Sequence, residues 1–180
     1  VGHLLEAGVN ALGGCCGTDP GFIVKLADKT MGWAPLQPAL DKGRGRYSLV
    51  CSASRTVAMG DGMPLTVIGE RLNPTGKKAL KLALQNGDMD AVFQMAREQM
   101  DAGAAILDIN ADVPGIDETV VLSRMVETVV QAVSIPVCLD SSNPVALEAA
   151  LRTYAGRAII NSVSGERMKL DRILPLAARY

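Results

Sequence analysis

The stretch IPVCLDSSNPVALEAALRTYAGRAIINSVS, residues 135–164, decides the fold. It consists of an apolar run, then a segment with apolar residues at helical spacing, then a second apolar run. Short runs rich in Val, Ile and Leu are typical of buried strands. The stretch therefore predicts a strand, a helix and a second, parallel strand, with Ser142 or Asn143 capping the helix and Pro144 in its first turn.

The same alternation extends upstream to about residue 63. Apolar runs at 65–70 and 104–110 precede segments with helical spacing at 77–103 and 115–134. Four strands that alternate with helices predict an α/β fold with a parallel sheet covered on both faces. Two architectures fit this pattern, a doubly wound sheet and a (β/α)8 TIM barrel.

The polar residues at the strand ends favour the barrel. Glu70, Asp108, Asn110, Asp140 and Asn161 stand at or near the ends of the four runs. In a barrel these ends converge on one mouth, which carries the active site. A doubly wound sheet often shows a glycine-rich phosphate turn, and this sequence has none after its strands. We therefore predict the first four βα units of a barrel, about half of the complete fold.

Some Asp and Asn residues after strands only cap the next helix, and this structural interpretation stays open for each position. However, Asp108 and Asp140 lie upstream of the expected caps. Carboxylates and amides in one mouth suit a flat heterocycle with several N–H donors. A metal site in this half is the weaker hypothesis, because residues 63–180 contain no histidine and His3 is the only one in the chain.

The first 32 residues predict a helix end, a strand at 9–14, a turn and a second helix from about residue 18. Thr18 or Asp19 is expected to cap the second helix, with Pro20 in its first turn. The turn, GGCCGT, holds Cys15 and Cys16, which are either small buried residues or thiolates that share a soft cation. A linker begins near Trp33. Residues 46–64, which start inside this linker, could form a hairpin with GDG as its turn.

The composition narrows the class of protein. The net charge is −1, the basic residues do not cluster beyond GKKALK and KGRGR, and aromatic residues make up 3% of the chain, so we expect no nucleic-acid partner. The sequence contains no apolar run of membrane-spanning length and no signal sequence, so we expect a cytoplasmic protein with reduced thiols and no membrane partner. The chain starts at Val1 and ends within a helical pattern, so we expect it to be a piece of a longer protein.

Three motifs, IGERLNPTGKKAL, GAAILDINADVPGIDE and CLDSSNPVALEAALRTYAGRAIINSVSGE, resemble the pterin-binding domain of methyltetrahydrofolate methyltransferases over residues 63–180. The resemblance implies that Asp108, Asp140 and Asn161 hydrogen-bond a pterin ring, and Asn110 and Glu70 belong to the same motifs. It also implies methyl transfer from 5-methyltetrahydrofolate to cob(I)alamin on another module. Two further functional positions of the family, an Asp and an Asn, belong to later strands. We therefore assign no catalytic residue and expect this chain alone to be inactive.

The stretch GVNALGGCCGT, residues 8–18, resembles the last strand of the zinc-dependent homocysteine methyltransferase barrel. That resemblance implies that Cys15 and Cys16 are two of three zinc thiolates and that homocysteine is the fourth ligand. The third cysteine of that family lies on an earlier strand, and neither Cys51 nor Cys138 matches it. We interpret both of these as structural.

The order of the two resemblances matches the module order of cobalamin-dependent methionine synthases. On this basis residues 1–32 are the end of a homocysteine and zinc barrel, residues 33–62 are a linker, and residues 63–180 are the first half of a pterin barrel. A methyltetrahydrofolate:corrinoid protein methyltransferase and a non-catalytic pterin-binding scaffold remain alternatives. Dihydropteroate synthase, another pterin enzyme with a barrel of this type, is a more distant choice.

Overall fold

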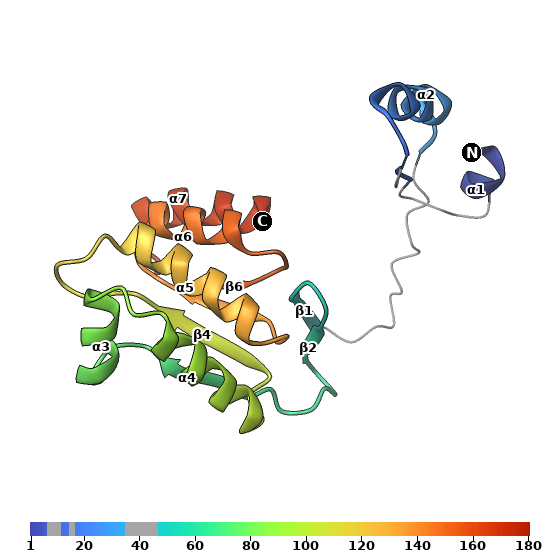
Figure 1. The fold of residues 1–180 in the computed structure, drawn as a ribbon. Helices are drawn as coiled ribbons and strands as arrows, with labels where there is room; N and C mark the ends of the chain where they lie inside the picture. The colour runs from blue at the N-terminus through green and yellow to red at the C-terminus, as the bar shows by residue number, and fades with distance from the viewer. Residues whose placement is uncertain (7–11, 15–16, 35–46) are drawn as a thin grey trace. The chain divides into compact units, whose positions relative to one another are not determined.

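The structure is a computed structural model that describes residues 1–6, 12–14, 17–34 and 47–180 (Figure 1). It divides into two compact units, Val1–Arg44 and Gly45–Tyr180, and each is described by itself. Across the described residues, no helix combines the length and the apolar character that a membrane span needs.

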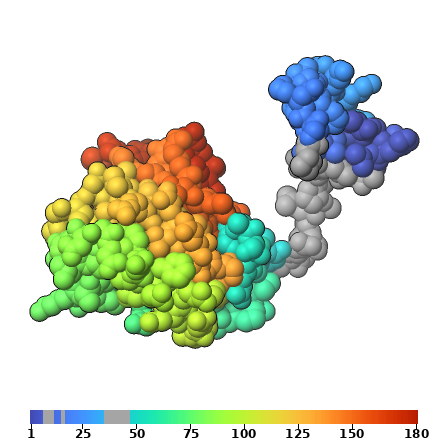
Figure 2. All heavy atoms as spheres, in the orientation of Figure 1, coloured from blue at the N-terminus to red at the C-terminus, as the bar shows by residue number. Residues whose placement is uncertain are grey.

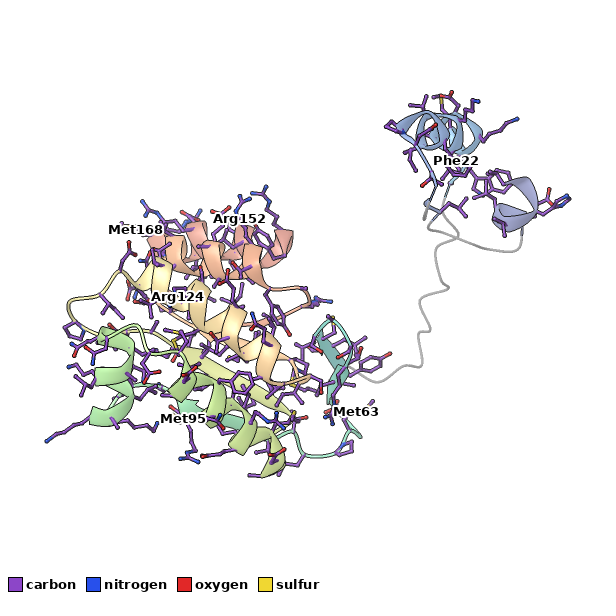
Figure 3. The ribbon with its side chains drawn as sticks, viewed as in Figure 1. Phe22, Met63, Met95, Arg124, Arg152 and Met168 are labelled. Atoms are coloured by element: carbon purple, nitrogen blue, oxygen red, sulfur yellow. The ribbon has the colours of Figure 1, made fainter. Side chains whose placement is uncertain are left out.

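The first unit contains helices α1 (Gly2–Glu6) and α2 (Pro20–Thr30). The side chain of Asp19 accepts a hydrogen bond from the Phe22 N–H at 2.7 Å, and Pro20 occupies the first turn of α2, which confirms the predicted start of this helix. α2 exposes Phe22, together with Ile23 and Val24 (Figure 3). Most of the predicted strand at 9–14 lies outside the described residues. Cys15 and Cys16 lie outside them as well.

The second unit begins with an antiparallel hairpin of β1 (Tyr47–Cys51) and β2 (Thr56–Gly60). Its turn lies at residues 52–55, where the Ser52 hydroxyl accepts the N–H groups of Ser54 and Arg55. The expectation that GDG forms the turn is therefore wrong. That tripeptide follows β2 instead, in the connection to the sheet. The hairpin lies within residues 33–62, the predicted linker, but it belongs to the second compact unit.

The sheet has the parallel strand order β3-β4-β5-β6, as the alternating pattern predicts. The strands are β3 (Ile68–Leu72), β4 (Ile106–Asn110), β5 (Val137–Asp140) and β6 (Ile159–Asn161). The helices between and after them are α3 (Lys78–Gln85), α4 (Asp90–Asp101), α5 (Glu118–Ala132), α6 (Pro144–Thr153) and α7 (Arg167–Arg179). Successive βα units in this order confirm the predicted α/β fold class.

Local sequence signals explain where these helices begin and end. The segment 77–103, which has helical spacing throughout, divides into α3 and α4 because Gly87 adopts a φ of 70° between them. Asp117 caps α5. Asn143 caps α6 by accepting the Val145 N–H at 3.0 Å, with Pro144 following it, which confirms the predicted cap.

One face of the sheet packs against the helices, which follow one another alongside the strands (Figure 1). Side chains of β4 and β5 that point to this face, such as Leu107 and Leu139, are fully buried with Leu122 of α5 and Leu147 of α6. The opposite face, called the inner face below, carries a separate apolar cluster of Ile106 and Cys138 with Val50 of the hairpin. The prediction of a sheet covered on both faces thus holds in part, with helices on one face and a hairpin on the other.

The hairpin is fixed at the end of the sheet where β5 and β6 begin. Cys51 and Arg157 exchange backbone hydrogen bonds of 3.0 and 2.8 Å, and the Tyr154 hydroxyl donates to the Cys51 carbonyl at 3.0 Å. In the space-filling view the hairpin lies against the segment that precedes β6 (Figure 2). The hairpin therefore closes the half of the inner face at which the strands start.

Candidate functional site

The predicted site residues gather at the other half of the inner face, where the strands end. Side chains alternate along a strand, so Asp108 and Asn110 of β4 share a face with Asp140 of β5 and Asn161 of β6. The strand register places Asn110 opposite Asp140, and Asp140 opposite Asn161. The sheet thus brings these four residues, each from a polar strand end, into one group.

Two amide–carboxylate hydrogen bonds connect the four side chains across the strands. The Asn110 amide donates from Nδ2 to Oδ2 of Asp140 at 3.0 Å. The Asn161 amide donates from Nδ2 to Oδ1 of Asp108 at 3.3 Å. We call these four residues the strand-end cluster. Its carboxylates retain acceptor capacity beyond these bonds, because each ionised carboxylate can accept about four.

Glu70, on the neighbouring strand β3, borders the strand-end cluster. A hollow of about 390 Å³ is lined by Glu70, Asp108 and Asn161, with apolar walls from β3 and β6. The Glu70 carboxylate accepts a hydrogen bond from Nδ2 of Asn73 at 3.3 Å. All five residues predicted for this site therefore lie at the same end of the sheet.

Asp108 is the buried carboxyl of the cluster, with 4% of its surface exposed. Burial raises its pKa, and the negative charges of Asp140 and Glu70 act in the same direction. Hydrogen bonds from the Cys138 thiol and the Asn161 amide lower the pKa but do not reverse the shift. The site thus holds a carboxyl whose ionised form would be stabilised by further N–H donors.

Cys138, which the sequence suggested was only structural, is part of this site. It lines the hollow, lies opposite Asp108 in the strand register and hydrogen-bonds its carboxyl. Burial, followed by the hydrogen bond and charge of Asp108, raises the pKa of the thiol, so that it stays protonated at neutral pH. The signal was available, because Cys138 precedes Asp140 by two residues and must share its face.

Lys77 is a second residue that the sequence did not single out. Its ammonium donates to the backbone carbonyl of Glu70 at 3.3 Å and to that of Asn73 at 3.0 Å. It therefore fixes the end of β3 and the loop after it, next to the strand-end cluster. A lysine in a loop that follows a strand carries no pattern that would have marked this role.

The predicted zinc ligands, Cys15 and Cys16, lie outside the described residues. In the part of the chain that the structure does describe, no three His, Cys, Asp or Glu side chains are arranged to hold a metal ion. The strand-end cluster presents hydrogen-bond donors and acceptors from two amides and two carboxylates. Its chemistry suits a planar, nitrogen-rich ligand.

Comparison with known proteins identifies a matching family, a similar curated protein and a similar solved structure. Residues 69–180 match the family described as pterin binding enzyme. A similar curated protein is the methionine synthase of Mycobacterium tuberculosis (strain ATCC 25618 / H37Rv), with 28% identity over 175 residues. The alignment covers 92% of this chain but 14% of that protein, so the chain spans a small part of its relative.

A solved structure with a similar fold is the crystal structure of dihydropteroate synthase from Thermus thermophilus. The TM-score is 0.51 and the sequence identity is 28%. The similarity covers 73% of this chain and 45% of the other chain. The predicted incomplete barrel is consistent with this similarity.

Proposed function

The chain belongs to the pterin binding enzyme family, and from this premise we propose that its strand-end cluster binds the pterin ring of 5-methyltetrahydrofolate. The observation that carries the proposal is the pair of amide–carboxylate hydrogen bonds, Asn110 to Asp140 and Asn161 to Asp108. They preorganise donors and acceptors at one end of a parallel sheet, which is where such folds bind their ligands.

The chemistry of the pterin ring matches these groups. Its pyrimidine part presents an amino group and a ring N–H on one edge, which a carboxylate accepts side by side. Its ring carbonyl and unprotonated nitrogens accept hydrogen bonds from Asn amides. A donor-rich ring would also supply Asp108 with N–H donors beyond the Asn161 amide, and so stabilise its buried carboxylate. We therefore propose that Asp108, Asp140 and Asn161 hydrogen-bond the pterin ring. Asn110 and Glu70 would lie beside the ring.

The proposed reaction is the transfer of the N5 methyl group to cob(I)alamin, which acts as the nucleophile and is carried by a cobalamin-binding domain in the same or another chain. The C–N bond breaks only if N5 gains a proton or a strong hydrogen bond, because an amide-like anion is a poor leaving group. The part of this chain is to bind and orient the ring and to keep polar groups fixed around it. We propose methionine as the product of the complete protein, with homocysteine as the final methyl acceptor, and the cytoplasm as its location.

Titration calorimetry with 5-methyltetrahydrofolate tests the binding step in the protein that carries this chain. Asp140→Ala and Asn161→Ala are each expected to weaken binding by about tenfold or more, because each removes a hydrogen bond to or from a charged or buried group. Glu127→Ala and Gln94→Ala change an exposed carboxylate and an exposed amide on the helices and serve as matched controls. Affinities that are equal in all four variants would refute the proposal.

The zinc proposal rests on sequence resemblance alone and has its own test. Cys15 and Cys16 would supply two thiolates, and a bound zinc would lower the pKa of the homocysteine thiol. We expect about one zinc per protein molecule and loss of tight zinc binding in Cys15→Ala, measured by metal analysis after dialysis. Retention of tight zinc by this variant would contradict the assignment, whereas pterin binding is expected to be unchanged in it.

The similarity to dihydropteroate synthase favours a second candidate, a pterin enzyme that transfers no methyl group. The two candidates differ in whether the methyl group of the ligand is transferred to cob(I)alamin. Methyl transfer to free or protein-bound cob(I)alamin changes the visible spectrum of the corrin, and only the first candidate predicts this change with 5-methyltetrahydrofolate. A methyltetrahydrofolate:corrinoid protein methyltransferase would share the spectral change but would not depend on Cys15 or on homocysteine. A pterin-binding scaffold would bind the ligand without any spectral change.

A further inference from the structure

Strand β3 contains a bulge at the point where it borders the strand-end cluster. Between two aligned pairs of residues, β3 has Glu70 and Arg71 where β4 has only Asp108. Such bulges are rare in parallel sheets and often lie next to functional sites, where they redirect a side chain. The alternation of β3 breaks here, because Glu70 lines the hollow on the inner face, whereas Arg71 pairs with Glu98 of α4 and Leu72 is buried among the helices. Glu70 is therefore the last residue of β3 on the inner face.

Gln99 of α4 contacts this bulge from the side of the sheet that the helices cover. Gln99 is buried, with 5% of its surface exposed, and its Oε1 accepts the backbone N–H of Arg71 at 2.7 Å. Its Nε2 donates to the Met95 carbonyl at 3.2 Å, so both ends of the amide are paired. A bulge disrupts the regular ladder of strand hydrogen bonds, and a buried N–H without a partner is costly. Gln99 supplies the acceptor that this shape of β3 requires.

Gly69, the residue before the bulge, leaves room for the Gln99 amide. A Cβ atom on Gly69 would lie 2.7 Å from Oε1 of Gln99 and 3.2 Å from side-chain atoms of Ala104 and Leu107. A side chain at this position would therefore displace the Gln99 amide, which is the flexible neighbour. A buried glutamine also costs desolvation that an apolar residue would avoid. The missing side chain on β3 and the buried amide on α4 thus act together at one place, on the backbone of the bulge.

Resting on the proposed function, we infer that Gln99 is a positioning residue of the pterin site, which fixes the Glu70 carboxylate beside the ring by holding the bulge. Glu70 shares the hollow with Asp108, and its carboxylate can accept N–H groups of a ligand. The Asn73 amide holds the same carboxylate from the following loop, at 3.3 Å. Gln99 lies on the helix-covered side of the sheet, so it acts on the ligand only through β3.

The test measures the affinity of the protein that carries this chain for 5-methyltetrahydrofolate by titration calorimetry. Glu70→Gln is expected to weaken binding about fivefold. Gln99→Met keeps the approximate size of the side chain but removes the acceptor, so it should weaken binding by a similar factor. The double variant Glu70→Gln/Gln99→Met should bind no more weakly than Glu70→Gln alone, because both changes act on one interaction. A multiplied loss of about 25-fold would overturn the inference, since the two residues would then act independently.

A rescue variant and a control separate positioning from stability. Gln99→Glu retains an oxygen acceptor for the Arg71 N–H, so affinity should stay within about twofold even though the buried charge lowers stability. Gln94→Met makes the same change as Gln99→Met at an exposed position of α4 and should leave both affinity and stability unchanged. Equal losses of affinity in Gln99→Glu and Gln99→Met would contradict a positioning role, because lost stability alone would then explain both.

Gly69→Ala perturbs the same contact without removing a polar group, and it serves if Gln99→Met does not fold. It should displace Oε1 of Gln99 and reproduce the loss of affinity, and unchanged affinity would count against the inference. If the ligand binds and Asp140→Ala weakens binding while Gln99→Met does not, the inference fails and the proposed function stands. If 5-methyltetrahydrofolate does not bind the unchanged protein, the proposed function fails, and the inference fails with it.

Discussion

The two halves of the inner face differ although the same strands build both. Where the strands begin, Ile106 and Cys138 pack against Val50 of the hairpin and form a closed apolar cluster. Where the strands end, Asp108 and Asp140 replace apolar side chains, and the surface is hollow. The inner face changes from apolar to polar between two consecutive inward-facing residues of β4, Ile106 and Asp108. A parallel sheet can thus carry a packed apolar half and a hollow polar half along the same strands, and the polar half is the one that we propose binds a ligand.

The largest expected effect comes from placing a charge in the apolar half. Val50 is 5% exposed, and Val50→Asp puts an unpaired carboxylate against Ile106 and Cys138. We expect a loss of about 3 kcal/mol in the free energy of unfolding, measured by urea denaturation. Leu49→Asp is the matched control, because Leu49 is the preceding residue of β1 and is 41% exposed. Similar losses in both variants would mean that the hairpin does not cover the inner face.

The next effect concerns the polar half, where one substitution is expected to weaken ligand binding and to stabilise the free protein. Asp108→Asn removes a negative charge from the proposed pterin site, so pterin affinity should fall about 10- to 100-fold. The same substitution should stabilise the free protein at neutral pH, because burial raises the pKa of Asp108 above its ordinary value of 3.8. With a raised pKa the folded protein binds the proton more tightly than the unfolded chain, so stability falls as pH rises from 3.8 through the folded-state pKa.

Thermal unfolding between pH 3 and pH 8 checks the stability part of this prediction. The unchanged protein should lose stability in the window above pH 3.8, and Asp108→Asn should lack that contribution. Glu127→Gln removes the same charge from an exposed position of α5 and should follow the unchanged protein. A lower unfolding temperature for Asp108→Asn than for the unchanged protein at pH 7 would contradict this prediction, because the carboxylate would then stabilise the folded protein.

A smaller effect concerns how the hairpin is held. Tyr154→Phe removes the hydroxyl that donates to the Cys51 carbonyl, and we expect a loss of about 1 kcal/mol in the free energy of unfolding. Burial raises the pKa of Tyr154 to about 12, so this bond should persist throughout the neutral range. Pterin affinity is expected to remain unchanged, since the bond lies at the opposite end of the strands. A change of more than threefold in affinity would show that the two halves are coupled.

The smallest effect tests the boundary between the halves, at Cys138. Cys138→Ser keeps a hydrogen-bond donor beside Asp108, so pterin affinity should change by less than about twofold. Cys138→Ala removes the donor and should raise the pKa of Asp108 further, because the thiol's hydrogen bond lowers it. A titration of the Asp108 carboxyl carbon by NMR distinguishes the variants. Identical titrations for Ser and Ala would mean that the thiol serves packing alone.

The sequence predicts the sheet well because its signals are local. Each strand is a short apolar run, and the caps at Asn143 and Asp19 depend on residues within three positions. The hairpin turn was misplaced because GDG is a strong turn signal, whereas the Ser52 side chain closes the turn through its own contacts. The break at Gly87 was missed because apolar spacing continues through it.

The site was predictable as a set of residues but not as a set of contacts. Asp108, Asp140 and Asn161 are recognisable as polar ends of apolar runs. Their pairing is not, because the Asn161–Asp108 bond crosses from β6 to β4, past β5, and depends on the strand order of the folded sheet. Lys77 acts through its side chain on backbone carbonyls, which any residue type supplies. Such contacts leave no trace in a residue pattern.

The bond between Tyr154 and Cys51 also has a consequence for the order of events during synthesis. It joins residues 103 positions apart, and the Ser52 hydroxyl reaches back from the hairpin to the Ser134 carbonyl, 82 positions away. Ribosomes add about 5–20 residues per second, so the hairpin leaves the ribosome roughly 5 to 20 seconds before its docking partners. During that interval Val50 and Val57 face water or a chaperone. The apolar end of the sheet is therefore closed only after the strands that the hairpin covers have been made.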